Sequence, residues 1–170
     1  MRKRILSAGI GLMIVGVLAA CGMRGAPNPK RSDGSENGSY ARVGGTQIKM
    51  ITENAEVIIT LNDSRAAADL AAMLPLELTL IERNRFAKGM TLPAPLSSTE
   101  STTRAYEIGD FGYWNAGPDL AIFYDDIYEQ TIVDVIPLGH AQSGAQKLAN
   151  ETGTVRLERV VEEGEQNTNE

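Results

Sequence analysis

The stretch that decides the fold is Gly109-Asp110-Phe111-Gly112-Tyr113-Trp114-Asn115-Ala116-Gly117-Pro118-Asp119-Leu120-Ala121-Ile122-Phe123-Tyr124. Two short runs of apolar and aromatic residues flank positions 115–119, where Asn, Gly, Pro and Asp favour a tight turn. The stretch therefore predicts two antiparallel strands joined by that turn. A mostly β-structured domain follows from this hairpin and from the similar short runs around it.

The hairpin also holds the aromatic candidates for a ligand site. Neighbouring residues on a strand point to opposite faces, so each adjacent aromatic pair offers one side chain to the core and one to a surface cleft. The candidate lining of a ligand cleft is Tyr113, Trp114, Phe123 and Tyr124. The alternative is that these rings only fill the interior of the domain.

Upstream of the hairpin the pattern predicts strands and one helix. Runs 47–52 and 55–61, separated by Asn54, form a second hairpin. Asp63 or Ser64 caps a helix, Ser64–Met73, which ends before Pro75. A strand over 76–82 follows, and residues 83–105 are expected to form a long loop.

Downstream the pattern predicts three further elements. These are a strand over 131–141 with a break at Pro137, a short helix Ser143–Asn150 capped by Ser143, and a closing strand over 154–160. Many short strands with two short helices favour a closed antiparallel β-barrel whose ends the helices cap, because closure removes exposed strand edges.

Several of these segments resemble the bacterial cyclophilin-like proteins. The Gly109–Trp114 run, Gly117, the Leu120–Tyr124 run and the Ile136-Pro137-Leu138-Gly139 strand carry the resemblance, which covers roughly residues 46–161. The resemblance implies a cyclophilin-type barrel of about eight strands. Members of this family often occur as lipoproteins, and most have no established activity.

The resemblance raises the question of prolyl isomerase activity. Cyclophilins with that activity use an arginine on the strand after the first helix, together with a Phe-x-Met-Gln segment. The strand predicted here over 76–82 holds no arginine, and Arg83 and Arg85 are expected to be solvated at its end. The favoured interpretation is a binding domain without catalytic residues. The alternative is a divergent prolyl isomerase that acts on exported proteins.

The first 21 residues have the composition of a lipoprotein export signal. Arg2, Lys3 and Arg4 precede an apolar run that is too short for a comfortable membrane span, which needs about 20 residues. Leu18-Ala19-Ala20-Cys21 resembles a lipobox, and Cys21 is the only cysteine of the chain. We therefore expect cleavage before Cys21, acylation of its thiol, and a protein anchored to the membrane in the cell envelope.

The composition of residues 21–170 divides them into three parts and limits the partners that the protein can bind. Residues 21–45 are rich in Gly, Pro, Ser and Asn, which predicts a flexible tether, residues 46–162 form the domain, and residues 163–170 form an acidic tail. Without residues 1–20, 13 Lys and Arg face 22 Asp and Glu, a net charge of −9. Such a chain is poorly suited to nucleic acid, so the expected ligand is a peptide or small molecule.

No motif predicts a metal site or a cofactor. His140 is the only histidine, and it has either a structural or exposed role or that of a general base. Asp110, Asp119, Asp125 and Asp126 follow one another closely in the sequence, and we expect solvated turns at these residues in preference to a cation site.

Overall fold

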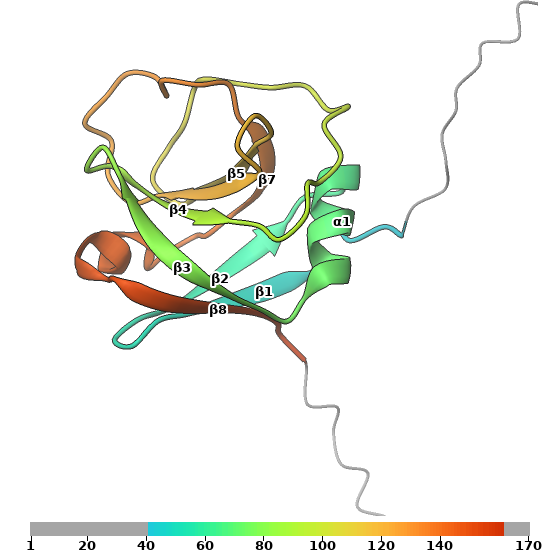
Figure 1. Cartoon of the computed structure of the whole chain (residues 1–170), viewed down its shortest axis with the longest axis horizontal. Helices are drawn as coiled ribbons and strands as arrows, with labels where there is room; N and C mark the ends of the chain where they lie inside the picture. Colours follow the sequence, from blue (N-terminus) through green and yellow to red (C-terminus); the bar gives the residue numbers. More distant parts are fainter. Residues whose placement is uncertain (1–40, 162–170) are drawn as a thin grey trace, which may run out of the picture. The chain divides into compact units, whose positions relative to one another are not determined.

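The computed structural model describes residues 41–161 as a closed barrel with two short helices (Figure 1). Its elements, in chain order, are β1 (Gln47–Ile51), β2 (Glu56–Leu61), α1 (Arg65–Met73), β3 (Leu76–Arg83), β4 (Ala87–Thr91), β5 (Asp110–Trp114), β6 (Asp119–Phe123), β7 (Ile136–His140), the 3-10 helix η1 (Ala145–Asn150) and β8 (Gly153–Arg159). The hairpin of residues 109–124 is confirmed as β5 and β6.

All pairings between the strands are antiparallel, and β1 closes the barrel by pairing with both β2 and β8. The strand order around the barrel is β1-β2-β7-β5-β6-β4-β3-β8. On β2, Val57, Ile59 and Leu61 are buried and alternate with more exposed residues, which is the pattern of one inward and one outward face. The prediction of an eight-stranded antiparallel barrel with two short helices is confirmed.

Helix α1 begins where the sequence predicted. The Ser64 hydroxyl accepts a hydrogen bond from the Ala67 backbone N–H at 3.1 Å, which caps the first turn. Leu70 is fully buried, and Ala66, Ala67 and Ala71 let the helix backbone approach the barrel closely. In Figure 1, α1 and η1 lie on opposite sides of the barrel.

The second helix differs from its prediction. Instead of an α-helix Ser143–Asn150 capped by Ser143, the chain forms the 3-10 helix η1, which begins at Ala145. The preceding residue, Gly144, has a φ of 88°, and no side chain caps the helix. A left-handed backbone at Gly144 redirects the chain, so Ser143 is not in the capping position.

Strand β4 was not predicted from the sequence, because it lies inside the segment expected to be a loop. Its residues do not alternate between apolar and polar, and it owes its conformation to its pairing with β3 and β6. Asn84 and Arg85 both have positive φ, 52° and 64°, as the tight turn between β3 and β4 requires. Strand β3 also runs one residue further than expected and includes Arg83.

The predicted strand over 131–141 is shorter in the structure. Only Ile136–His140 belongs to β7, and residues 131–134 run as an irregular segment outside the barrel. The backbone of Val135 pairs with Thr103 instead, which makes an isolated bridge between two long loops.

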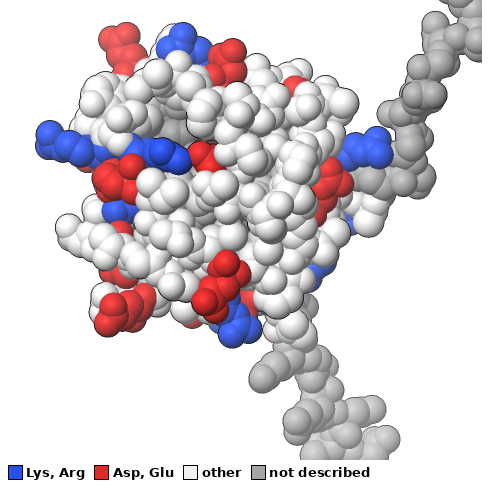
Figure 2. Space-filling view, in the orientation of Figure 1, with Lys and Arg blue, Asp and Glu red and all other residues white. Residues whose placement is uncertain are grey.

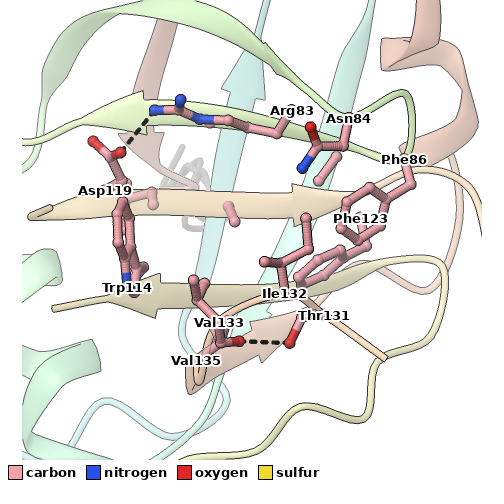
Figure 3. Close-up of a pocket in the computed structure, with 14 residues that line it drawn as sticks. Arg83, Asn84, Phe86, Trp114, Asp119, Phe123, Thr131, Ile132, Val133 and Val135 are labelled. Atoms are coloured by element: carbon pink, nitrogen blue, oxygen red, sulfur yellow. Dashed lines mark hydrogen bonds and ion pairs between the residues drawn. The ribbon is translucent and has the colours of Figure 1, made fainter. Parts of the chain in front are cut away.

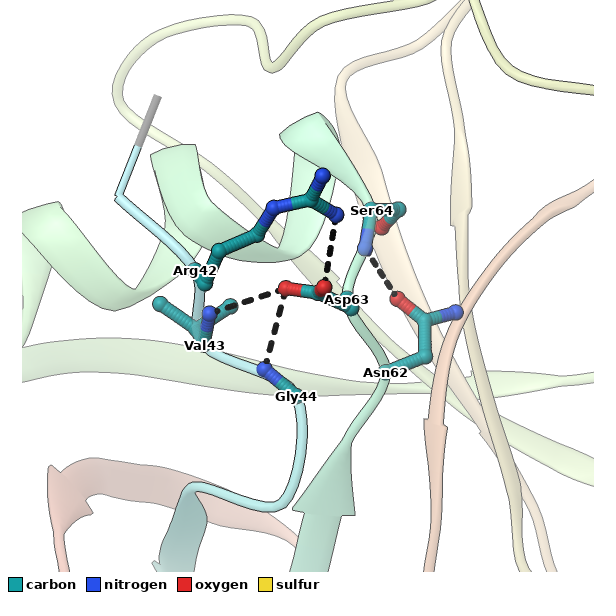
Figure 4. Close-up of polar contacts among 6 residues, drawn as sticks. All are labelled: Arg42, Val43, Gly44, Asn62, Asp63 and Ser64. Carbon is teal, nitrogen blue, oxygen red and sulfur yellow. Dashed lines mark hydrogen bonds and ion pairs between the residues drawn. The ribbon is translucent and has the colours of Figure 1, made fainter. Parts of the chain in front are cut away.

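Residues 42–45 contact the domain, although the sequence assigned them to the tether (Figure 4). The Asp63 carboxylate accepts hydrogen bonds from the backbone N–H groups of Val43 and Gly44 and from Arg42 Nη1 at 2.7 Å. Val43 is buried in the main core. The packed part of the chain therefore starts before the predicted boundary at residue 46.

The predicted export signal, Cys21, most of the predicted tether and the whole of the predicted acidic tail lie outside the described residues. Within residues 41–161, no helix is long and apolar enough to cross a membrane.

Candidate ligand groove

A groove of about 210 Å³ crosses the outer face of β4, β6 and β5 (Figure 3). Its floor consists of small residues, because Ala87 and Gly89 on β4 lie beside β6 and Gly89 is paired with Ala121. Larger side chains rise around this floor, and most of them are apolar. In Figure 2 the groove is the hollow in the upper left, bordered below by a blue band that ends at a red patch.

One end of the groove is closed by aromatic rings. Phe86 and Phe123 line it, and their ring centroids are 5.5 Å apart. Tyr106 packs against Phe123 at 4.7 Å, and Tyr128 packs edge-on against Phe86 at 5.2 Å. The rings of Phe86, Phe123 and Tyr106 belong to a second, smaller apolar cluster that is separate from the main core, and Tyr128 covers it from the surface.

The loop over residues 125–135 forms one wall of the groove. Thr131, Ile132, Val133 and Val135 line it. Thr131 fixes the loop, because its backbone N–H donates to the carbonyl of Arg104 at 2.8 Å and its own carbonyl accepts from Arg104 Nε at 2.8 Å. Its hydroxyl donates to the Val133 carbonyl at 2.6 Å, as Figure 3 shows. The groove is therefore formed without a ligand.

Arg83 forms the opposite wall. Its side chain lies over Gly89, where an added Cβ would come within 2.7 Å of Arg83 Nε. Its Nη2 donates to Asp119 Oδ2 at 2.7 Å, and Asp119 also accepts from the Thr91 hydroxyl. Arg83 was expected to be solvated at the strand end, and its side chain is 41% exposed, but it also pairs with Asp119 because Gly89 leaves room for the arginine to lie flat along the groove.

Two of the four aromatic residues predicted to line a cleft, Trp114 and Phe123, line the groove. Trp114 stands at the end opposite Phe86 and packs against Gly117, where an added Cβ would lie 2.6 Å from its ring. Tyr113 and Tyr124 are not among the lining residues. Tyr113 is buried in the barrel core, and its hydroxyl accepts from the Leu96 backbone N–H.

Tyr124 belongs to a polar cluster with Glu82 and Lys88. The Tyr124 hydroxyl donates to Glu82 Oε1 at 2.9 Å, and Lys88 Nζ donates to Glu82 Oε2 at 2.7 Å. Burial, followed by the Glu82 carboxylate, raises the pKa of Tyr124 to about 12. Burial opposes ionisation of Glu82, but the hydrogen bonds from Lys88 and Tyr124 outweigh it and lower the pKa of Glu82. Glu82 therefore supplies a charged partner for the Lys88 side chain, which is only 3% exposed.

His140 lies on another part of the surface. Its Nδ1 is 2.9 Å from Asp110 Oδ1, and Asp110 Oδ2 accepts from the Glu107 backbone N–H. Both side chains of this pair are close to half exposed. Within residues 41–161, no group of three or more His, Cys, Asp and Glu could hold a metal ion.

Sequence reasoning missed the residues that shape the groove floor and its charged wall. Gly89 and Ala121 create the space, and Asp119 holds Arg83 beside it. Gly89 was the available signal, because an isolated glycine in a strand often marks the close approach of another group. Without a predicted β4, that signal could not be placed.

Other proteins of known structure share this fold. The solution structure of the hypothetical protein AF2241 from Archaeoglobus fulgidus aligns with a TM-score of 0.59 and 19% identity, over 71% of this chain and 98% of that chain. The structure of McbB in complex with tryptophan aligns with a TM-score of 0.58 and 15% identity, over 68% of this chain and 45% of that chain. At these identities the likeness establishes the fold alone.

A search of curated proteins found no match. The model of the cyclophilin-like family matches residues 50–158, which is more than half of the 170 residues. Together with the closed eight-stranded barrel, this match shows that the chain belongs to the cyclophilin-like family.

Proposed function

We propose that this protein binds peptides outside the cytoplasm by holding one apolar side chain in the groove between Arg83 and the loop over residues 125–135. The size of the groove carries the proposal. Pockets for drug-sized ligands occupy about 300–1,000 Å³, whereas this groove occupies about 210 Å³. It suits a single side chain of an extended peptide better than a whole cofactor.

The surroundings of the groove support a peptide. Ile132 is 66% exposed at its rim, and Ile127 and Tyr128 on the same loop are each 48% exposed. Exposed apolar residues gathered beside a groove are typical of interaction sites. Because the hydrogen bonds of Thr131 already hold the loop, a ligand would not have to order it, and less binding energy is lost.

The remaining donors of Arg83 suit a peptide backbone. The guanidinium group has five N–H donors, and one nitrogen, Nη2, bonds to Asp119. The other donors lie along the groove wall, where a backbone carbonyl next to the bound side chain would accept a hydrogen bond. A free carboxylate suits the site less, because Asp119 already pairs with this cation and the processed chain has a net charge of −9.

The proposed location rests on the sequence of the first 21 residues. Acyl chains on Cys21 would hold the protein on the membrane, and the residues between Cys21 and the barrel would let the groove face exported or envelope proteins.

Filling the groove floor tests the binding proposal. Acetylated and amidated tripeptides with a central Leu or Phe are titrated into the full-length protein, and the fluorescence of Trp114, the only tryptophan, reports occupancy. Ala121→Leu should abolish the response, whereas the same change at the exposed Ala72 on α1 should preserve it. Unchanged binding by Ala121→Leu would exclude this groove as the site.

The position of Arg83 favours a second candidate, a divergent prolyl isomerase. A catalyst of prolyl rotation gains only from groups that favour the twisted amide, and a guanidinium group beside an apolar groove can supply such hydrogen bonds. The ion pair between Arg83 and Asp119 favours the binding role, because Asp119 already occupies one nitrogen of the guanidinium group. A protease-coupled assay on a prolyl tetrapeptide separates the two. Acceleration that Arg83→Lys abolishes and Arg85→Lys preserves would establish the enzyme.

A further inference from the structure

We infer that the groove prefers cationic peptides, in which Lys or Arg flanks the apolar residue. This inference rests on the proposed function and adds the charge of the ligand. It follows from the loop over residues 125–135, which contains four carboxylates and no Lys or Arg. The four are Asp125, Asp126, Glu129 and Asp134.

These carboxylates lie beside the groove. Tyr128 packs edge-on against Phe86 at the aromatic end, and Asp126 and Glu129 lie within two residues of Tyr128 in the chain. Asp134 lies between Val133 and Val135, and both of these valines line the wall. Asp126, Glu129 and Asp134 are exposed, so they can meet charges on a peptide that extends beyond the groove.

Nearby cations do not neutralise the loop. Arg83 is paired with Asp119 and Lys88 with Glu82, so these four charges cancel as two pairs. Arg85 and Arg104 remain near four carboxylates, and none of the ion pairs between described residues includes an acid of the loop. An excess of negative charge therefore faces a bound peptide on the loop side.

Arg83 on one wall and the acidic loop on the other together favour one kind of ligand. The central apolar side chain occupies the space over Ala121, and a neighbouring backbone carbonyl faces the free donors of Arg83. Lys or Arg on either side of the apolar residue would face the carboxylates of the loop. Because these charges are exposed, the gain in affinity from them is moderate and depends on salt concentration.

Four acetylated and amidated tripeptides test this preference on the full-length protein: Lys-Leu-Lys, Gln-Leu-Gln, Glu-Leu-Glu and Lys-Gly-Lys. Trp114 fluorescence measures each dissociation constant. We expect Lys-Leu-Lys to bind about tenfold more tightly than Glu-Leu-Glu at ~0.1 M salt, with Gln-Leu-Gln between them. The difference should shrink at ~1 M salt, where the Debye length falls to about 3 Å. Lys-Gly-Lys should bind far more weakly than Lys-Leu-Lys, because it lacks the apolar side chain.

A matched set of variants assigns the preference to the loop. The double variant Asp126→Asn with Glu129→Gln should lose most of the difference between Lys-Leu-Lys and Glu-Leu-Glu. Glu53→Gln, an exposed acid in the turn between β1 and β2, should keep it. A preference that survives the double variant would overturn the inference.

The remaining outcomes separate this inference from the proposed function. Equal affinity of the three Leu peptides would refute the charge preference and leave the binding groove intact. Equal affinity of Lys-Gly-Lys and Lys-Leu-Lys would show unspecific attraction between charges and refute the inference. If none of the Leu peptides binds, both the inference and the proposed function fail.

Discussion

Removing Arg83 tests whether its pair with Asp119 holds the groove wall in place. Arg83→Met keeps a long unbranched side chain over Gly89 but leaves the Asp119 carboxylate, which is 10% exposed, with the Thr91 hydroxyl as its remaining side-chain partner among residues 41–161. Removing one partner of a fully buried ion pair costs about 3–5 kcal/mol. The Arg83 side chain is 41% exposed, so solvent screens the pair. We therefore expect a loss of about 1–2 kcal/mol.

Urea unfolding followed by circular dichroism measures this loss, with Arg85→Met, on the neighbouring turn, as the control. In a thermal unfolding experiment the same loss should appear as a decrease in Tm of roughly 4 °C per kcal/mol for a domain of this size. Adding Asp119→Asn to Arg83→Met should restore part of the stability, because it removes the unpaired charge. A loss below about 0.3 kcal/mol, or strictly additive effects in this double-mutant cycle, would refute the reasoning.

Three further predictions concern the barrel, its polar cluster and the anchor. Leu70→Asp should lower the free energy of unfolding by several kcal/mol, because it places an unpaired charge in the core, whereas Ala72→Asp on the exposed side of α1 should have little effect; urea titration distinguishes them. Since the pKa of Tyr124 is raised from 10.0 to about 12, its contribution to stability should be complete below pH 10 and lost between pH 10 and 12, by roughly 2–3 kcal/mol. Tyr124→Phe should flatten this part of the pH profile, and an identical alkaline decline in the variant would count against the raised pKa. Cys21→Ser should yield an unprocessed chain without lipid, and mass spectrometry of a cleaved wild-type chain that carries no acyl group would contradict the anchor.

Local sequence patterns predicted the elements whose conformation depends on residues close to them in the chain. The hairpin of residues 109–124 combines its own turn residues with alternating faces, and Ser64 supplies its own helix cap. Strand β4 has neither signal. Its sequence Ala-Lys-Gly-Met-Thr becomes a strand because β3 and β6 flank it, and this depends on contacts far apart in the chain.

The groove was predictable only in part for the same reason. The aromatic pairs indicated that one ring of each pair faces a cleft but not which one, and the structure places Trp114 and Phe123 at the groove. The small residues of the floor and the position of Arg83 depend on the register of β4 against β6, which places Gly89 opposite Ala121. The segment over 131–135 looked like a strand because it is rich in β-branched residues, yet in the structure most of these residues line the groove.

Chemical-shift mapping of the full-length protein with Ac-Lys-Leu-Lys-amide tests the central claim most directly. We predict that a titration to saturation shifts the indole N–H of Trp114 and the backbone amides of Gly89 and Ala121, with smaller changes along residues 126–133. Resonances of η1 and of the outer face of β1 and β2 should stay in place. Shifts that cluster around His140 or η1 and spare Trp114, Gly89 and Ala121 would contradict the account.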